Sequence, residues 1–275
     1  MKDAVILTHG DWKAKVLPSF GMNTFSLQFQ NKDILRSPEN LEALKDSPFQ
    51  HGTPLLFPAN RTKDGKFTFE SKEYQMVLNE PSRNNHLHGL MFDAPFTVLS
   101  TTENTLVAQY KNQGERYPFP FIMTATDTLD DTGYTRTLEI LNSGNTAMPY
   151  TLAYHTTFIA AERFSCPLKE KYDVDINFIP TGKMLPAEQE FIDGTSSEGK
   201  HISAFYTANG TVATNGEFTY EFSENFDNIV LFNAKGVKNF MCIEPQAGAV
   251  NGLNSGACHV LLPGEKAVYV HKIKR

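Results

Sequence analysis

The sequence predicts an all-β protein: a large antiparallel β-sandwich with few short helices, formed as a single domain over residues 1–275. Short apolar runs follow one another, separated by turn residues such as Gly, Asp and Pro. Almost no segment repeats its apolar residues with the period of a helix. The 21 Phe and 10 Tyr residues suit the half-buried surface of a sheet. Together these observations favour a sandwich or barrel over a parallel α/β sheet.

Composition sets the size of the core and excludes some partners. At 275 residues and 40% hydrophobic, the chain is long enough to bury the core of one large β domain. The net charge is −6, and basic residues concentrate only at 272–275. Nucleic acids and anionic membranes are bound through concentrated basic patches, so neither is expected as a partner. The sequence is compatible with a monomer or a homodimer.

The three cysteines indicate a reducing compartment. Cys166, Cys242 and Cys258 are odd in number and lack the spacing of metal ligands, which is typical of small buried residues. Only three strongly apolar residues precede Thr8, too few for the core of a signal peptide. No window approaches the roughly 20 apolar residues of a membrane span. A cytoplasmic protein is therefore expected.

The first half of the chain shows period-two patterns. Residues 24–30 alternate apolar and polar side chains, which predicts a strand. Residues 38–46, ahead of Pro48, are the best candidate for a short helix. The connection from Asp130 to Gly133 predicts a hairpin. Further strands are expected at 5–7, 66–70, 74–78, 96–100, 106–110, 121–129 and 134–141.

The second half continues in the same way. Residues 180–216 are rich in Pro, Gly, Ser and Thr, which predicts an irregular surface segment. Strands are expected at 150–155, 172–179, 217–222, 229–232, 240–244, 259–262 and 267–273.

The sequence lacks several familiar catalytic signatures. It contains no G-x-G-x-x-G after a strand and no P-loop, so nucleotide binding by those routes is not expected. It also contains no G-x-S-x-G nucleophile elbow.

Glu244 is the first candidate for a functional residue. It ends the predicted strand 240–244, whose other residues are apolar, and Pro245 is expected to end the pairing because it lacks an N–H. Side chains two apart share a face, so Phe240, Cys242 and Glu244 point the same way. A carboxylate at the end of an apolar layer suits a general base; the alternative is an ordinary surface residue.

Other polar residues also stand where apolar strands begin or end. Asn60 and Arg61 end one apolar run, and His155 ends another. Asp227 precedes the run 229–232. Each has an ordinary alternative, such as a structural salt bridge for Arg61 or a satisfied core position for His155. In an antiparallel sandwich such ends can converge on one rim or concave face.

His86 and His88 would lie on one face of a strand, which is one arrangement for a metal site. A third ligand is not evident nearby. The preferred interpretation is one polar active-site residue, His88, and one structural histidine, with no metal bound.

These motifs, in this order, resemble the aldose 1-epimerase (galactose mutarotase-like) family, whose fold is a β-supersandwich. The resemblance extends over about residues 20–273. The matching segments are Leu55 to Arg61, His88-Gly89-Leu90, His155 after Pro149, Phe226-Asp227, and Glu244-Pro245 with Asn251 and Asn254. Gln246 stands where the family often has a Trp, which makes it a place to look for an unusual substrate.

The resemblance implies an enzyme that interconverts the α and β anomers of a free aldose without a cofactor. His155 and Glu244 would be catalytic, with Glu244 as the base and His155 as the acid. Asn60, Arg61, His88 and Asp227 would bind the sugar. The acid would be a protonated imidazole, so a nearby carboxylate such as that of Asp227 is expected to raise the pKa of His155.

Three alternatives remain at this stage. A protein of the same fold could bind or sense sugars without turnover. A hexose 6-phosphate 1-epimerase would need extra cationic residues, for which Arg83 and Arg116 are candidates. A glycosidase would need two carboxylates, and Asp227 and Glu244 are the candidates. His155 would then have no role.

Overall fold

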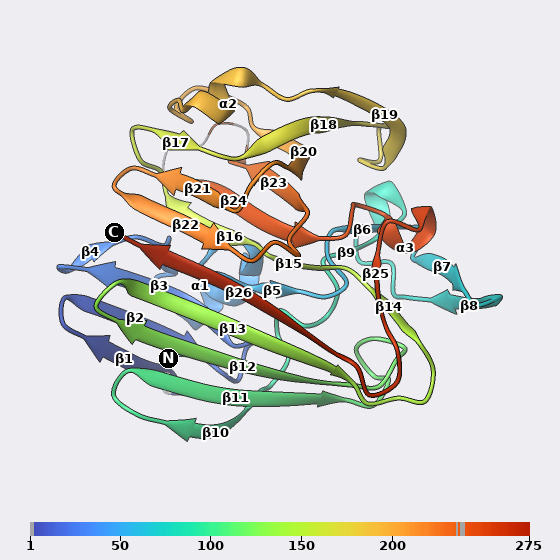
Figure 1. Ribbon diagram of the computed structural model, residues 1–275, viewed down its shortest axis with the longest axis horizontal. Coiled ribbons are helices and arrows are strands. Elements are labelled where there is room, and N and C mark those ends of the chain that lie inside the picture. The colour runs from blue at the N-terminus through green and yellow to red at the C-terminus, as the bar shows by residue number, and fades with distance from the viewer. Residues whose placement is uncertain (1–2, 235, 237–239) are drawn as a thin grey trace.

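The structure, a computed structural model, describes residues 3–234, 236 and 240–275. Two antiparallel eight-stranded sheets form its body (Figure 1). The first contains, in spatial order, β10 (Thr97–Thr101), β11 (Thr105–Asn112), β12 (Phe121–Asp130), β13 (Gly133–Asn142), β26 (Lys266–Lys274), β22 (Phe218–Phe222), β21 (Val212–Asn215) and β17 (Phe164–Ser165).

The second sheet carries the strands on which most of the candidate residues lie. Its order is β19 (Pro180–Pro186), β18 (Leu168–Val174), β20 (Ser203–Ala208), β23 (Asn228–Phe232), β24 (Phe240–Ala247), β15 (Leu152–Tyr154) and β5 (Leu55–Leu56), with β16 (Thr156–Ile159) also paired to β24.

Smaller elements complete the fold. A four-stranded sheet contains β1 (Val5–His9), β2 (Trp12–Leu17), β3 (Asn23–Phe29) and β4 (Lys32–Asp33). The two-stranded pairs are β6 (Arg61–Lys63) with β9 (Asn85–Leu87), β7 (Lys66–Phe69) with β8 (Lys72–Gln75), and β14 (Met148–Tyr150) with β25 (His259–Leu261). The helices are α1 (Leu41–Asp46), α2 (Gln189–Asp193) and α3 (Gly252–Ser255), with 3-10 turns η1 (Pro48–Gln50) and η2 (Pro81–Arg83).

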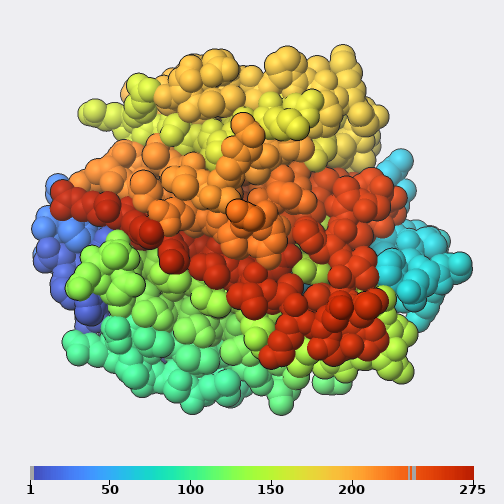
Figure 2. Space-filling model, viewed as in Figure 1, coloured from blue at the N-terminus to red at the C-terminus, as the bar shows by residue number. Residues whose placement is uncertain are grey.

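The core lies between the two large sheets, and strand alternation decides what enters it. Met241 and Ile243 of β24 belong to the main hydrophobic cluster. Across the interface, the rings of Tyr154 on β15 and His271 on β26 lie 4.3 Å apart. Because alternate side chains point to opposite faces, Glu244 lies on the other face of the second sheet. Figure 2 shows β26 crossing the surface between the green β12–β13 segment and the orange β21–β22 segment.

The predicted all-β sandwich with few short helices is confirmed. The hairpin is confirmed too: Asp130 pairs with Gly133, and its carboxylate accepts the backbone N–H groups of Thr132 and Gly133. The predicted short helix is α1, and it begins at Leu41 because the Asn40 side chain caps the N–H of Ala43. Among the described residues, no helix is long and apolar enough to cross a lipid bilayer.

Three local predictions were wrong. Residues 180–216 contain β19, α2, β20 and β21. The sequence does not predict β19, because it is an edge strand with little buried surface and so lacks an apolar pattern. The predicted strand 172–179 stops at Val174, because the Asp175 carboxylate accepts the N–H groups of Asn177 and Ile179 and forms a turn. Pairing also continues past Pro245 as far as Ala247, opposite Leu152.

Candidate active site

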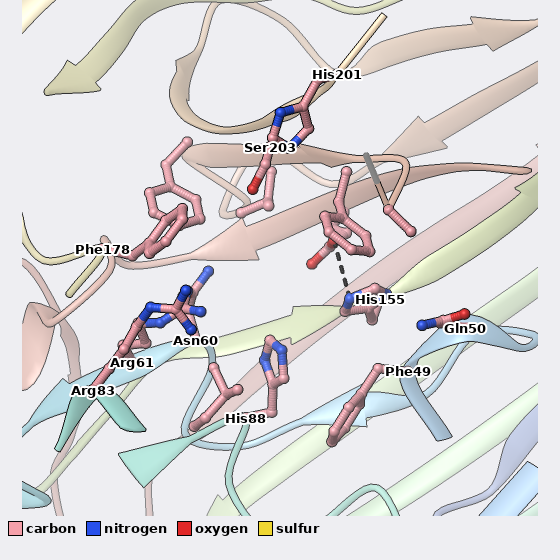
Figure 3. A pocket seen from close by; sticks show the side chains of 16 residues that line it. Phe49, Gln50, Asn60, Arg61, Arg83, His88, His155, Phe178, His201 and Ser203 are labelled. Carbon is pink, nitrogen blue, oxygen red and sulfur yellow. Dashed lines mark hydrogen bonds and ion pairs between the residues drawn. The ribbon is translucent and has the colours of Figure 1, made fainter. Parts of the chain in front are cut away.

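A cavity of about 490 Å³ opens on the outer face of the second large sheet. This volume lies within the range of small-molecule binding sites. The sheet supplies the floor of the cavity, with His155, Ser203, Phe205, Val230, Phe232 and Glu244. Loops and short elements supply the rim, which includes Phe49, Asn60, Arg61, Arg83, His88 and Phe178 (Figure 3). The structure thus brings five of the six predicted site residues together.

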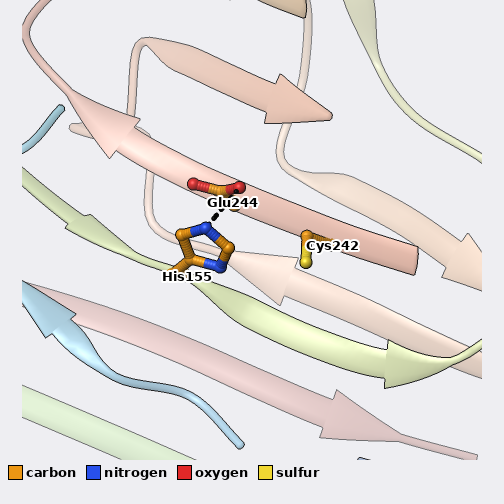
Figure 4. Close-up of side chains that lie close together, drawn as sticks. All are labelled: His155, Cys242 and Glu244. Atoms are coloured by element: carbon orange, nitrogen blue, oxygen red, sulfur yellow. Dashed lines mark ion pairs between the residues drawn. The ribbon is translucent and has the colours of Figure 1, made fainter. Parts of the chain in front are cut away.

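The strand register places His155 and Glu244 opposite each other. Ala153 pairs with Gln246 on one side, and Thr156 pairs with Ile243 on the other. Counting inward from both pairs leads to His155 facing Glu244. The backbone N–H of His155 donates to the carbonyl of Pro54, which continues the register in which Ala153 pairs with Leu56 and Tyr154 with Leu55 of β5. His155 Nε2 lies 3.3 Å from Glu244 Oε1 (Figure 4).

The two side chains are close but not hydrogen-bonded to each other. Glu244 Oε1 and His155 Nδ1 have no hydrogen-bond partner within the described part of the chain. Both side chains are almost completely buried, with exposed fractions of 2% for Glu244 and 6% for His155. Buried polar atoms are normally paired, and those left free at a cavity are ready to bond a ligand. The pair therefore has free acceptor and donor positions next to the pocket.

Burial sets the protonation of this pair. It raises the pKa of Glu244 well above 4.5, and the positive charge of Arg61 opposes this shift only in part. It lowers the pKa of His155 to about 4. The expectation that His155 has a raised pKa, supported by Asp227, was therefore wrong for the site without ligand. Of the two groups, Glu244 therefore holds a proton more strongly and His155 is the free base.

His88 reaches the pocket because it leaves its strand. β9 ends at Leu87, and His88 has a positive φ of 64°, with its N–H bonded to the carbonyl of Asn60. Its ring lies 4.6 Å from that of Phe49 and 5.4 Å, edge-on, from that of His155. His86 instead bonds the carbonyl of Val77 through Nδ1. The shared face that would suggest a metal site does not form.

Asn60 and Arg61 lie at the start of β6, on the rim. Asn60 has a φ of 56°, and its amide donates to Gln246 Oε1 at 3.4 Å. Gln246 is buried beneath it and is not part of the pocket wall. Arg61 forms a bidentate pair with Glu80, with both N–O distances 2.9 Å. Arg61 is thus both ion-paired and part of the wall, so a structural salt bridge and a ligand-binding role are compatible at this residue.

Asp227 lies outside the pocket. Its Oδ1 accepts the backbone N–H of Gly248 at 2.8 Å and the side-chain amide of Asn228 at 2.7 Å. Its Oδ2 is 3.7 Å from Nε2 of His259. These contacts fasten the loop that follows β24. The structure does not bring Asp227 together with the other predicted site residues.

Several pocket residues were absent from the predicted site. Phe49 and Gln50 lie in η1, Phe178 in the turn after β18, and His201 just before β20. None of them belongs to a periodic pattern that distinguishes a pocket from an ordinary loop. The sequence suggests Arg83 only as a candidate for phosphate binding, and the structure places it on the rim. Arg116 pairs with Asp93 and the carbonyl of Leu90 and is not part of the wall.

One group of side chains has the composition of a metal site. Ligand atoms of His155, Cys242 and Glu244 lie within 4.8 Å of one another (Figure 4). Burial raises the pKa of the Cys242 thiol well above its usual range, and its Sγ lies 3.4 Å from the hydroxyl of Thr157. A cation bound there would have to displace the thiol proton and would occupy both members of the acid–base pair.

The sequence profile described as "Aldose 1-epimerase" matches residues 3–274, nearly the whole chain. The chain belongs to the aldose 1-epimerase family. The family generally consists of isomerases that act on sugars. An uncharacterized Escherichia coli protein, YihR, is 27% identical over 286 residues, covering 95% of this chain and 89% of its own length.

Solved structures of the family share the fold. A galactose mutarotase-like protein from Clostridium acetobutylicum superposes with a TM-score of 0.91 at 23% identity, covering 98% of this chain and 94% of its own. Galactose 1-epimerase from Lactobacillus acidophilus superposes with a TM-score of 0.81 at 18% identity, covering 98% and 93%. These likenesses show the fold alone.

Proposed function

We propose that this protein is an aldose 1-epimerase that interconverts the α and β anomers of a free aldose. The observation that carries the proposal is the opposed pair of His155 and Glu244 in the pocket of a family member. The pair offers an acid and a base of different chemical type, which is what opening and closing a sugar ring requires.

Ring opening needs one proton removed and one delivered. The base takes the proton of the C1 hydroxyl, the C1–ring-oxygen bond breaks, and the acid protonates the ring oxygen. Rotation about C1–C2 exposes the other face of the aldehyde, and the same two groups reverse their roles as the ring closes. The cycle returns every proton to its starting place, so no cofactor is needed.

Sugar binding assigns the roles within the pair. In the site without ligand the proton belongs on Glu244, because burial raises the pKa of that carboxyl and lowers the pKa of His155. A C1 hydroxyl that donates to the carboxylate stabilises its charged form and moves the proton to the imidazole. Glu244 then acts as the base and His155 as the acid. Asn60, Arg61 and His88 bind ring hydroxyls in this proposal.

The proposal also includes a single-domain organisation and a reducing compartment. The main hydrophobic cluster includes residues from β1 through β26, which supports a single domain. The three cysteines are free, which supports a reducing compartment such as the cytoplasm.

Polarimetry of freshly dissolved α-glucose and α-galactose tests the proposal. Glu244→Gln and His155→Asn should each remove most of the acceleration, since each catalytic group contributes about 10²–10⁴-fold. Glu139→Gln and His259→Asn remove the same functional groups outside the pocket and serve as controls. Sugar binding in calorimetry without acceleration by the wild-type protein would instead identify a non-catalytic binding protein.

A further inference from the structure

The rim of the pocket carries more positive charge than a neutral sugar requires. Arg61 and Arg83 both belong to the wall, and Glu244 is the one acidic residue among the described residues that line it. Behind the wall, Glu80 accepts two hydrogen bonds from Arg61 and one of 3.1 Å from Arg83 Nη1. One carboxylate faces two guanidinium groups, so one positive charge at this rim is not balanced.

Arg83 has free hydrogen-bond donors. Its side chain is 37% exposed, compared with 14% for Arg61. Within the described part of the chain, its Nε and Nη2 have no hydrogen-bond partner, whereas Arg61 uses both Nε and Nη2 on Glu80. A guanidinium group has donors and no acceptor, so these free groups favour a ligand rich in acceptor oxygens. Phosphate, sulfonate and carboxylate groups have this character.

The two guanidinium groups are also held in place. Their Cζ atoms lie 4.9 Å (Arg61) and 4.7 Å (Arg83) from the centroid of the Phe178 ring. Phe178 has a φ of 59°, a conformation imposed by the turn that the Asp175 carboxylate forms. Stacking on a fixed ring lowers the entropy that an arginine loses when it binds an anion.

The position of this cluster relates it to the sugar. Figure 3 shows Arg61, Arg83 and Phe178 gathered on one side of the pocket and His155 on the other. An aldose with C1 beside His155 would therefore direct its far end toward the arginines. We propose that the pocket selects an aldose with an anionic substituent remote from C1, bound by Arg83 next to Arg61. This inference rests on the proposed epimerase activity and names its substrate class.

An anomer-exchange panel measured by NMR tests the inference. The sugars are glucose, glucose 6-phosphate, 6-deoxy-6-sulfoglucose and glucuronate, which separate phosphate, sulfonate and carboxylate. At least one anionic sugar should exceed glucose in kcat/KM by about 10–100-fold, the effect of one or two hydrogen bonds to a charged group. Preference for glucose over all three would overturn the inference and leave the epimerase activity standing.

Substitution of Arg83 locates the effect. Arg83→Gln should lower the ratio of kcat/KM between the preferred anionic sugar and glucose about 10-fold or more, chiefly through KM, and Arg83→Lys should restore part of it. Arg116→Gln removes an equal charge from a guanidinium paired outside the wall and should leave the ratio unchanged. Equal ratios in wild type and Arg83→Gln, with matching thermal melts, would contradict the assignment.

Binding separates this inference from the epimerase proposal. If no aldose is accelerated, the proposed activity fails, and calorimetry still compares glucose with the three anionic sugars. Tighter binding of an anionic sugar, weakened by Arg83→Gln and by added salt, would support the anionic subsite on its own. Equal binding of glucose and the anionic sugars would overturn it.

Discussion

His155 and Glu244 face each other across two neighbouring strands, with Nε2 and Oε1 3.3 Å apart and no hydrogen bond between them. The ladders on both sides fix this relationship, since Ala153 pairs with Gln246 and Thr156 with Ile243. The separation of the two groups thus depends on backbone pairing rather than on flexible loops. In the proposed reaction, such support would hold the two groups in position before the sugar binds.

The dependence of kcat/KM on pH should be bell-shaped. As pH falls through about 4, His155 takes up a second proton and the pair loses its base. As pH rises through the raised pKa of Glu244, the pair loses its one proton and with it the acid. Anomer exchange of glucose, corrected for the uncatalysed rate, measures the profile. An acid limb at 6.5, the ordinary imidazole value, would contradict the effect of burial.

Glu244→Gln should stabilise the protein at neutral and alkaline pH. The folded-state pKa of Glu244 is raised, so its contribution to stability is complete below 4.5 and is lost as pH rises through the raised value. An amide cannot ionise and avoids this loss, which for a buried unpaired group is at least about 1–3 kcal/mol. Urea unfolding at pH 4.5 and 8 should show the two proteins equal at the lower pH and the variant more stable at the higher. Glu139→Gln is the surface control.

Gly89→Ala should be strongly destabilising. Gly89 has a φ of 67°, and a Cβ atom there would lie 1.9 Å from the carbonyl oxygen of Phe57. The backbone must shift to relieve this overlap, so we expect a loss of at least about 3 kcal/mol in the free energy of unfolding. Gly10→Ala is a matched control, because Gly10 has a φ of 54° and no atom within 4 Å of the added Cβ. Similar losses in both variants would mean that φ strain alone matters.

Asp227→Ala should affect stability more than sugar binding. The substitution removes the acceptor of the Gly248 N–H, at a cost of about 1 kcal/mol. Because Asp227 is not part of the pocket wall, KM should change less than about threefold, compared with tenfold or more for Arg61→Gln. An increase of KM in Asp227→Ala as large as that in Arg61→Gln would place the carboxylate in contact with the sugar.

The sequence predicted the residues whose positions follow from strand patterns. Glu244 and His155 are conspicuous as ionisable residues within apolar runs, and alternation correctly placed Cys242 on the same face as Glu244. That the two converge on one pocket depends on β15, β16 and β24 being neighbours, which strand patterns do not reveal and the sheet order shows.

The rim was largely beyond prediction, because it consists of turns whose positions depend on distant partners. Phe178 enters the pocket only because Asp175 breaks a run that reads as one continuous strand. His88 departs from alternation because its φ is positive. Asp227 lies outside the pocket for a related reason: its carboxylate accepts the N–H of Gly248, which is 21 residues away in sequence.

The pocket has two separable parts, a floor of paired strands that carries His155 and Glu244 and a rim of turns that carries Arg83 and Phe178. The rim residues belong to short segments that do not interrupt the ladders beneath them. Under the proposed mechanism, exchange of these turns between relatives would change the choice of sugar and preserve the proton chemistry. The substrate preference of such a protein could thus change in evolution through a few rim residues, while the paired strands that carry His155 and Glu244 stay the same.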